Sequence, residues 1–375
     1  MKLSVEPVRA RLRAPFAAAW GTITERELLV VRLEAADGAV GWGEAAPLPG
    51  YGGPAAEEVG AALDGYRGAL AEVAAALEAH RGALERAGDG PRDQLLAACA
   101  AASALPEALA AVDLALWDLE GRRRREPVWR LLSQSPWDIT RNIPGQYPTH
   151  RDVIVNATIT AAEPSSVAEQ VATARAAGFQ CVKVKVGLGD DGARVAAARS
   201  AGGEGIAIRI DANGAWSVDQ AVAALDALAQ FGIELCEEPV HGPDAIARVA
   251  AASPIPIAVD ETAAVPGALE RRVCDAACLK IARCGGLTGL LERAARARAS
   301  GYRIYLASTL DGPLAIAAAL HAAVAVRPEL PCGLATLGVF ADRPDPLPAR
   351  GGRIATPAGP GLGERLREWY RLGGG

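Results

Sequence analysis

The sequence predicts an α/β protein in which a parallel β/α barrel follows a small α+β domain. From about residue 153 onward, short apolar runs alternate with Ala-rich helical segments, and eight such runs can be counted. Alternating β and α units favour parallel strands with right-handed crossovers, and eight in succession are typical of a closed barrel. Before residue 132 the texture differs, because two strands around Asp37-Gly38 precede an Ala-rich helical stretch.

The elements follow in order along the chain. Residues 1–130 are expected to form the α+β capping domain, with a hairpin in LLVVRLEAADGAVGWGE and helices from 55 to 132. In AVDLALWDLEG, Val112, Leu116 and Leu119 share one helical face, and the Arg run that follows ends the helix. NIPGQYP (142–148) is typical of a linker, and 150–340 is expected to form the barrel. The Pro- and Gly-rich segment 341–375 is expected to return to the cap and to end in a short helix, GERLREWYRL.

Composition excludes several classes of function. The 375 residues carry a net charge of −5 without a basic stripe, so nucleic acid is not an expected partner. Seven cysteines without a C-x-x-C pair indicate a reducing compartment, and we expect a cytoplasmic location. No apolar run approaches the roughly 20 residues of a membrane span, and FAAAW is too short for a signal-peptide core. A small-molecule substrate and a homo-oligomer are expected.

Carboxylates end three successive predicted strands, where a barrel carries its chemistry. Asp211, Glu237 and Asp260 are separated by 26 and 23 residues, one βα unit each, and therefore face a common point. Three anions held together need a cation. Oxygen ligands without His or Cys nearby suit Mg²⁺, with Mn²⁺ as an alternative. Helix capping is the other explanation, and it accounts for one such carboxylate more readily than for three.

Three lysines accompany these carboxylates. Lys183 and Lys185 leave the second predicted strand on the same face, and Lys280 lies on the sixth strand, across the barrel. Beside a metal, desolvation and like charge are expected to lower a lysine pKa, so that the amine can act as a general base. A divalent ion that holds a substrate carboxylate would stabilise the enediolate formed when the α-proton leaves.

The stretch CVKVKVGLGDDG (181–192) allows a different interpretation. Gly187, Gly189 and Gly192 form a G-x-G-x-x-G after an apolar run, as in a dinucleotide-binding loop. In such a loop Asp190 and Asp191 would face the pyrophosphate, which is electrostatically unfavourable. This interpretation also leaves the later carboxylates unexplained, so a loop after a barrel strand is favoured.

The motifs VKVKVG, RIDANGAW, CEEPV, AVDET, LKIARCGGLTG and AVDLALWDLEG occur in this order. Together they resemble the muconate-lactonizing-enzyme subgroup of the enolase superfamily, a group also named after mandelate racemase, over nearly the whole chain. The resemblance implies a modified TIM barrel, (β/α)7β-like, with a cap completed by the C-terminal tail. It also implies Asp211, Glu237 and Asp260 as Mg²⁺ ligands. Lys185 would be the base on one face, with Lys280 on the other face and Lys183 assisting electrostatically. Arg283 stands where the family pattern has a second Lys, at a position that is not catalytic in the family.

The substrate is less well determined. VNATI and the stretch STLDGPLAIAAALHAAVAVRPELPCGLAT resemble o-succinylbenzoate synthases, which favours a dehydration. However, STLDG also resembles cycloisomerases, and the cap is longer than is typical of the synthases. Four alternatives stay open: an N-acylamino acid racemase, a muconate cycloisomerase, a dipeptide epimerase and a non-catalytic metabolite-binding barrel. The eighth strand lacks an Asp-x-Asp for a dipeptide amine, which disfavours the epimerase.

The resemblance also implies that two cap loops, here 16–24 and 47–53, close over the barrel mouth and determine specificity. The candidate substrate contacts are Trp20, Tyr51, Asn213, Ser308 and Asp311. For Trp20 and Tyr51, packing at the domain interface explains an aromatic side chain equally well.

Overall fold

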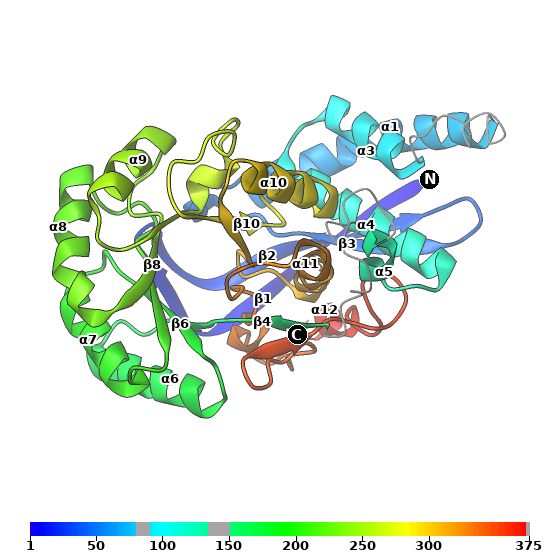
Figure 1. The fold of residues 1–375 in the computed structure, drawn as a ribbon. Coiled ribbons are helices and arrows are strands. Elements are labelled where there is room, and N and C mark those ends of the chain that lie inside the picture. Colours follow the sequence, from blue (N-terminus) through cyan, green and yellow to red (C-terminus); the bar gives the residue numbers. More distant parts are fainter. Residues whose placement is uncertain (80–90, 134–150, 373–375) are drawn as a thin grey trace.

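The computed structural model describes residues 1–79, 91–133 and 151–372. In it, seven parallel strands that follow one another in chain order form the wall of a barrel (Figure 1). They are β5 (Ala157–Ile159), β6 (Cys181–Lys185), β7 (Ala207–Asp211), β8 (Ile233–Glu237), β9 (Ile257–Val259), β10 (Ala276–Lys280) and β11 (Arg303–Ala307). The predicted α/β architecture is confirmed.

The wall closes through two residues instead of a full eighth strand. Gly333 bridges to Ala307 at the end of β11, and Cys332 bridges to Val155 just before β5. The predicted first strand, VIVNATI, is divided: its first part, β4 (Asp152–Ile154), pairs antiparallel with β12 (Arg353–Ala355). Only its second part joins the wall as β5. The barrel is therefore (β/α)7β-like, as expected, with its last strand reduced to a pair of bridges.

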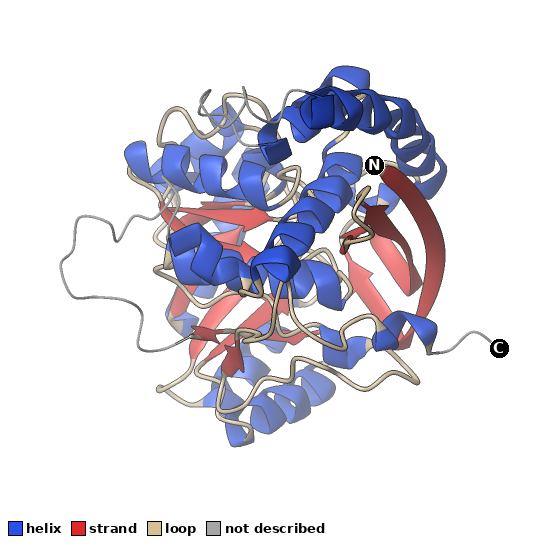
Figure 2. Ribbon diagram, turned by 90° about the vertical axis from the view of Figure 1, so that its right-hand side faces the viewer, coloured by secondary structure: helices blue, strands red, loops and turns tan. Residues whose placement is uncertain are grey.

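Helices cover the outside of the wall (Figure 2). They are α6 (Pro164–Ala176), α7 (Asp191–Gly202), α8 (Val218–Leu228), α9 (Pro243–Ala252), α10 (Leu287–Ala299) and α11 (Pro313–Val326). Short 3-10 turns lie at Pro49–Tyr51, Ala229–Phe231, Glu261–Ala264 and Leu337–Val339. The local sequence explains where several of these helices begin. Proline occupies the first turn of α6, α9 and α11, and at α8 Ser217 forms a capping box with Gln220.

The segment GLGDDG is the loop between β6 and α7, as favoured from the sequence. The Asp190 carboxylate accepts a hydrogen bond from the Ala193 amide (2.9 Å), and Asp191 accepts one from the Gly187 amide (2.8 Å). These carboxylates engage the loop amides that a dinucleotide phosphate would need. The geometry thus argues against a dinucleotide loop.

A second sheet lies beside the barrel and is antiparallel. It contains β1 (Lys2–Ala18), β2 (Gly21–Glu34) and β3 (Val40–Ala45), and the hairpin between β2 and β3 turns at Asp37-Gly38 as predicted. The expected cap loop at 16–24 is instead the hairpin that joins β1 to β2, with Trp20 in its turn. The loop at 47–53 contains the 3-10 turn that carries Tyr51.

Four described helices complete this region: α1 (Ala56–Ala79), α3 (Pro91–Ala102), α4 (Pro106–Arg124) and α5 (Val128–Ser133). The Arg run ends α4 as predicted, and its side chains pair with acidic groups of the same region. The predicted linker at 142–148 lies outside the described residues. Helix α11 contacts both α5 and β3 and is buried on nearly all sides, which fits its apolar sequence.

The C-terminal segment crosses back to the antiparallel sheet that contains β1. Phe340 bridges to Leu12, and the Arg343 guanidinium donates to the Arg9 carbonyl (2.9 Å). The final helix, α12 (Glu368–Arg371), has only 4 residues and is shorter than the predicted GERLREWYRL helix. The division of the chain at residues 130, 150 and 340 stays a prediction.

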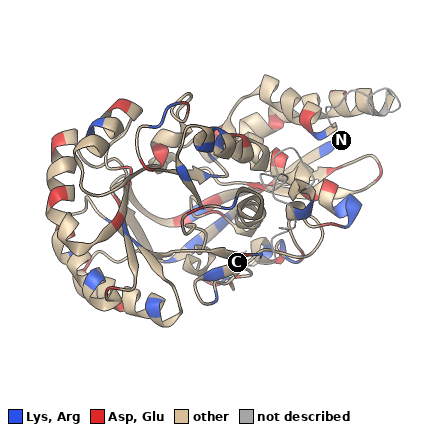
Figure 3. Ribbon diagram, viewed as in Figure 1, with Lys and Arg blue, Asp and Glu red and all other residues tan. Residues whose placement is uncertain are grey.

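Charges of both signs are interspersed along the helices in view (Figure 3). The net charge of the chain is −5. All seven cysteines lie in the described ranges and are free thiols. In the same ranges, no helix combines the length and the apolar character that a membrane span requires.

Strand β3 and helix α4 approach so closely that side chains do not fit between them. A Cβ at Gly43 would overlap the Ala111 carbonyl oxygen. We expect Gly43→Ala to lower the free energy of unfolding by about 1–3 kcal/mol, because the backbone must move. Urea unfolding measures this change.

Gly65→Ala is the matched control, because Gly65 is exposed within α1 and has no neighbour within 4 Å. It should raise the stability by about 0.5–1 kcal/mol through helix propensity. Equal effects of the two variants would contradict the close approach of β3 and α4.

Candidate active site at the barrel mouth

The carboxylates and lysines singled out in the sequence meet at the C-terminal ends of the barrel strands. Lys185, Asp211 and Glu237 are register partners on β6, β7 and β8. Asp260 directly follows β9, and Lys280 ends β10. Parallel strands bring such ends to one edge, so residues about one βα unit apart become neighbours.

Lys183 and Lys185 lie directly against two of the carboxylates. Lys183 Nζ is 2.8 Å from Asp211 Oδ2 and 2.6 Å from Glu237 Oε1, and Lys185 Nζ is 2.6 Å from Asp211 Oδ2. Burial alone would raise the pKa of Asp211, but the two ammonium groups hold it well below its usual range. Burial would likewise lower the pKa of Lys183, but Asp211 and Glu237 raise it well above its usual value.

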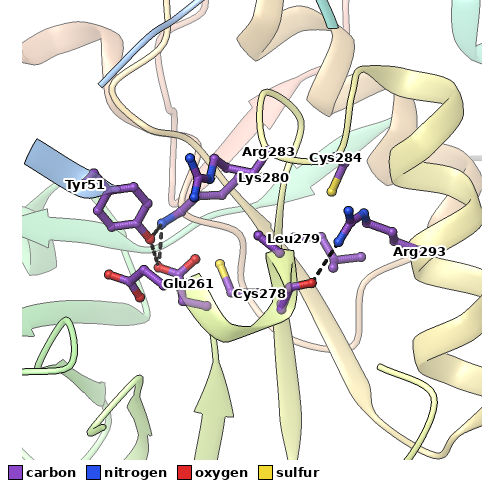
Figure 4. A pocket seen from close by; sticks show the side chains of 11 residues that line it. Tyr51, Glu261, Cys278, Leu279, Lys280, Arg283, Cys284 and Arg293 are labelled. Atoms are coloured by element: carbon purple, nitrogen blue, oxygen red, sulfur yellow. Dashed lines mark hydrogen bonds and ion pairs between the residues drawn. The ribbon is translucent and has the colours of Figure 1, made fainter. Parts of the chain in front are cut away.

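The same direct pairing is found at Lys280. Its Nζ is 2.5 Å from Asp260 Oδ2, and the Tyr51 hydroxyl contacts both groups (Figure 4). The Lys280 ammonium also lies 4.2 Å from the centre of the Tyr51 ring. Burial would lower the pKa of Lys280, yet Asp260 raises it. In this arrangement each amine faces carboxylates directly, which raises the pKa of Lys183 and of Lys280, and the lowered lysine pKa expected beside a metal stays a prediction.

The donor set at this edge suits a hard cation. One oxygen each of Glu237 and Asp260 and the Cys278 sulfur lie within 4.8 Å of one another. Burial raises the pKa of the Cys278 thiol well above its usual value, so oxygen remains the available ligand type. Asp211 is not in this group, since its Oδ2 faces the two lysines. Burial, with Asp211 and Asp260 nearby, raises the pKa of Glu237 to about 7 despite Lys183. Clustered carboxylates of this kind fit a magnesium site.

Glu238, next to a predicted ligand, has a different task. Its Oε2 accepts a hydrogen bond from the Asp260 amide (2.7 Å), and its Oε1 accepts one from the Thr262 amide (2.9 Å). The fully buried Glu238 therefore holds the backbone that carries Asp260 and Glu261. The sequence analysis did not predict this role of Glu238, for which its position next to Glu237 was the only signal.

A pocket that is partly open to solvent lies between the barrel mouth and the two cap segments. Three lysines and Ser308 line it, together with Tyr51 and Trp20 from the cap. The rings of Trp20 and Tyr51 meet edge to face with centroids 6.1 Å apart. Both predicted aromatic residues thus lie at the interface and at the pocket, which joins the two explanations offered for them.

Two other candidates lie outside this lining. Asn213 accepts a hydrogen bond from Lys185 Nζ (2.6 Å) and donates one to Glu261 (3.0 Å). Asp311 is fully buried and accepts a hydrogen bond from the Thr309 amide (3.2 Å). The structure therefore gives Asn213 and Asp311 protein partners, and their role as substrate contacts stays a prediction.

A buried arginine ties the cap to the strand ends. The Arg26 guanidinium donates to the carbonyls of Ala46 (3.1 Å), Pro47 (2.5 Å) and Leu310 (3.4 Å). Pro47 begins the segment that carries Tyr51, and Leu310 lines the pocket. The sequence offered no signal for Arg26, because its partners are carbonyl groups of distant segments.

Comparison with known proteins agrees with this geometry. Residues 1–133 match the description "Mandelate racemase / muconate lactonizing enzyme, N-terminal domain", and residues 166–370 match "Enolase C-terminal domain-like". The chain is 31% identical over 303 residues to a hydrophobic dipeptide epimerase of Enterococcus faecalis, with 78% of each chain covered. The structure of the E. faecalis V583 dipeptide epimerase, complexed with Mg and the dipeptide L-Leu-L-Tyr, matches with a TM-score of 0.80 and 25% identity, over 96% of this chain and 98% of that chain.

Two further relatives catalyse other reactions. An N-succinyl-L-Arg/Lys racemase of Bacillus cereus is 25% identical over 84% of this chain and 81% of its own length. An o-succinylbenzoate synthase of Mycobacterium tuberculosis is 40% identical over 206 residues, which cover 52% of this chain and 60% of the synthase. Because both domain descriptions match, and the lysines and carboxylates meet at the barrel mouth, the chain belongs to the mandelate racemase/muconate lactonizing enzyme group of the enolase superfamily, a group of racemases, epimerases and cycloisomerases.

Proposed function

We propose that this enzyme removes a proton α to a carboxylate of a small-molecule substrate. The observation that carries the proposal is the placement of Lys185 and Lys280, which come from β6 and β10 and line one pocket. A substrate held between them offers its α-carbon to an amine on each side. Lys185 accepts the proton in the favoured reaction, and Lys183, which also lines the pocket, adds positive charge beside the substrate carboxylate.

The choice of basic residue supports a role in proton transfer. The chain has only four lysines, Lys2, Lys183, Lys185 and Lys280, among 39 basic residues. Three of these four lie at the barrel mouth, and arginine serves nearly everywhere else. Arginine keeps its proton under all ordinary conditions, whereas a lysine can lose it. A site that needed only positive charge would have no reason for this preference.

Asp211, Glu237 and Asp260 would hold Mg²⁺, and Mn²⁺ is expected to replace it because it prefers similar oxygen ligands. When bound, the ion would orient the substrate carboxylate and stabilise the negative charge that develops on it. With the ion bound, these carboxylates would be shared between it and Lys183, Lys185 and Lys280, which line the same pocket as the substrate.

The lining of the pocket narrows the substrate class. Among the described residues that line it, none is acidic, and hydroxyl groups of Thr158, Ser308, Thr309 and Thr336 accompany the lysines. A free dipeptide amine would find no carboxylate there, whereas an acidic substrate without an amine meets complementary charge. This supports o-succinylbenzoate formation by dehydration as the favoured reaction, together with the similarity to the M. tuberculosis synthase.

A second candidate is the racemisation of an N-succinylamino acid. Its acylated nitrogen carries no charge, so the same lining accepts it. Lysines on two sides of the pocket allow one amine to remove the proton and the other to return it. The B. cereus racemase is a relative of this type. The expected homo-oligomer and cytoplasmic location stay predictions.

We expect Lys185→Arg to lower kcat for the dehydration by about 10²–10⁴-fold, because the guanidinium keeps the charge but cannot accept a proton. Loss of the diene absorbance of the cyclohexadiene precursor in the presence of Mg²⁺ measures the rate. Lys2→Arg, the same change at a lysine outside the mouth, should leave the rate unchanged. An active Lys185→Arg enzyme would refute the role of this amine. Inactive wild-type enzyme toward this precursor moves the proposal to the racemase reaction, and inactivity toward both substrates supports a non-catalytic binding barrel.

Mg²⁺ should stabilise the fold through the carboxylates. At a concentration of about 100 times its Kd, it is expected to raise the free energy of unfolding by about 2.7 kcal/mol. Asp211→Asn should abolish this rise, whereas Asp226→Asn, on the exposed face of α8, should retain it. Thermal unfolding with and without Mg²⁺ gives both values. An unaltered rise in Asp211→Asn would place the ion elsewhere.

A further inference from the structure

We propose that Glu261, acting through Asn213, fixes the direction in which the Lys185 amine points. The hydrogen bonds that connect Glu261, Asn213 and Lys185 are seen in the structure. Their importance for catalysis rests on the proposed function. Glu261 and Asn213 are positioning residues in this proposal, since neither lines the larger pocket.

Asn213 connects the other two residues by one group each. Its Oδ1 accepts a hydrogen bond from Lys185 Nζ (2.6 Å), and its Nδ2 donates one to Glu261 Oε1 (3.0 Å). Asn213 is only 5% exposed, and its backbone amide donates to Asp211 Oδ1 (2.9 Å). Its φ of 45° lies in the left-handed region, which asparagine tolerates better than most residues. The side chain is thus held at both ends and at its backbone.

The carboxylate of Glu261 decides which way the amide is turned. A carboxylate only accepts hydrogen bonds, so it must face the Nδ2 group of Asn213. The amide oxygen is then directed to Lys185, where a donor is available. A residue able to donate at position 261 would allow the opposite orientation, with an amide N–H facing the N–H groups of the lysine.

Among the described residues, hydrogen bonds link Glu261 to Lys185 only through Asn213, although its carboxylate also interacts with the charge of Lys280. Its Oε2 is buried and has no hydrogen-bond partner among the described residues, so the one side-chain hydrogen bond that Glu261 accepts there comes from Asn213. The backbone around Glu261 is held by Glu238, which accepts from the amides on both sides, those of Asp260 and Thr262. Glu261 lines a small pocket with Tyr51 and Lys280, seen in Figure 4.

These contacts leave Lys185 one free direction. Its amine donates to Asp211 Oδ2 (2.6 Å) and to Asn213 Oδ1 (2.6 Å). A neutral amine has two N–H groups and one lone pair, so the lone pair then takes the remaining position. That position belongs to the pocket side, where Lys185 lines the cavity and lies 5.7 Å from the centre of the Phe16 ring. The lone pair would receive the substrate proton, while the C–H bonding electrons stay on the substrate.

The arrangement serves one face of the pocket. Lys280 has the Asp260 carboxylate and the Tyr51 hydroxyl as its described partners, and no amide. A change in Glu261 should therefore alter Lys185 most, through the lost hydrogen bond to Asn213, and alter Lys280 less, because Lys280 has no hydrogen bond to this pair and loses only a nearby charge.

Because the chain has only four lysines, selective ¹⁵N labelling of lysine makes the two amines separately observable. Lys185→Arg and Lys280→Arg assign the two signals. In Glu261→Leu we expect the Lys185 Nζ signal to shift and its hydrogen exchange to accelerate at least about tenfold, with a clearly smaller change in the Lys280 signal and no such acceleration of its hydrogen exchange. Glu270→Leu, at an exposed glutamate, should change neither signal. A Lys185 signal that does not respond to Glu261→Leu, or a Lys280 signal that responds equally, overturns the proposal.

A paired exchange of side chains tests the direction of the hydrogen bonds. Asn213→Asp alone places a carboxylate against that of Glu261. It should shift the Lys185 Nζ signal and lower the Lys185-dependent rate. Adding Glu261→Gln returns a donor to this contact and restores the original net charge. We expect the double variant to recover kcat to within about threefold of wild type, with KM little changed throughout. If the Lys185 Nζ signal of the double variant does not return toward its wild-type position, the proposed role of Glu261 and Asn213 is overturned. If the wild type turns over neither substrate, the proposed function fails. The two NMR comparisons still test whether Glu261 and Asn213 orient the Lys185 amine.

Discussion

The structure depends on the compensation of carboxylates that end adjacent parallel strands. Asp211 and Glu237 are fully buried, and Asp260 nearly so, which is costly for charged groups unless each has a partner. Lys183 bridges Asp211 and Glu237, and Lys280 meets Asp260. Such a cluster tolerates little movement, because a displaced partner leaves an uncompensated buried charge. The surrounding residues accordingly hold it from several directions.

Those holding contacts come from every layer of the molecule. Glu238 fixes the backbone after β9, and the Tyr305 hydroxyl donates a hydrogen bond to Glu237 Oε2 (2.6 Å). From the cap, Arg26 secures the segment that brings Tyr51 to Asp260 and Lys280. The C-terminal tail takes part through Tyr370, whose hydroxyl contacts the buried Glu44 beside the Gly312 amide. The cap is therefore a component of the site as well as its cover, because it supplies the three aromatic rings that line the pocket, those of Phe16, Trp20 and Tyr51.

Elements decided by local pattern were predictable, and those decided by distant partners were not. The β2–β3 hairpin and the Pro-initiated helices follow from residues within the element itself. By contrast, the first predicted strand is divided because β4 pairs with β12, some 200 residues away in the chain. The eighth strand contributes two bridging residues, and the last helix is reduced to 4 residues. For the divided first strand and the eighth strand, the pairing partner lies far away in the chain.

The sequence by itself determined which residues meet at the barrel mouth. One βα unit separates each candidate carboxylate from the next. Parallel strands bring such positions to a single edge, whatever the length or conformation of the loops. Only the tertiary structure decided how each side chain is used there. It turned Asp211 toward the lysines, assigned Glu238 to the backbone and joined Asn213 to Lys185 and Glu261. The physical reason is that strand spacing sets the position of a Cα, whereas the direction of a buried polar side chain is set by partners remote in the chain.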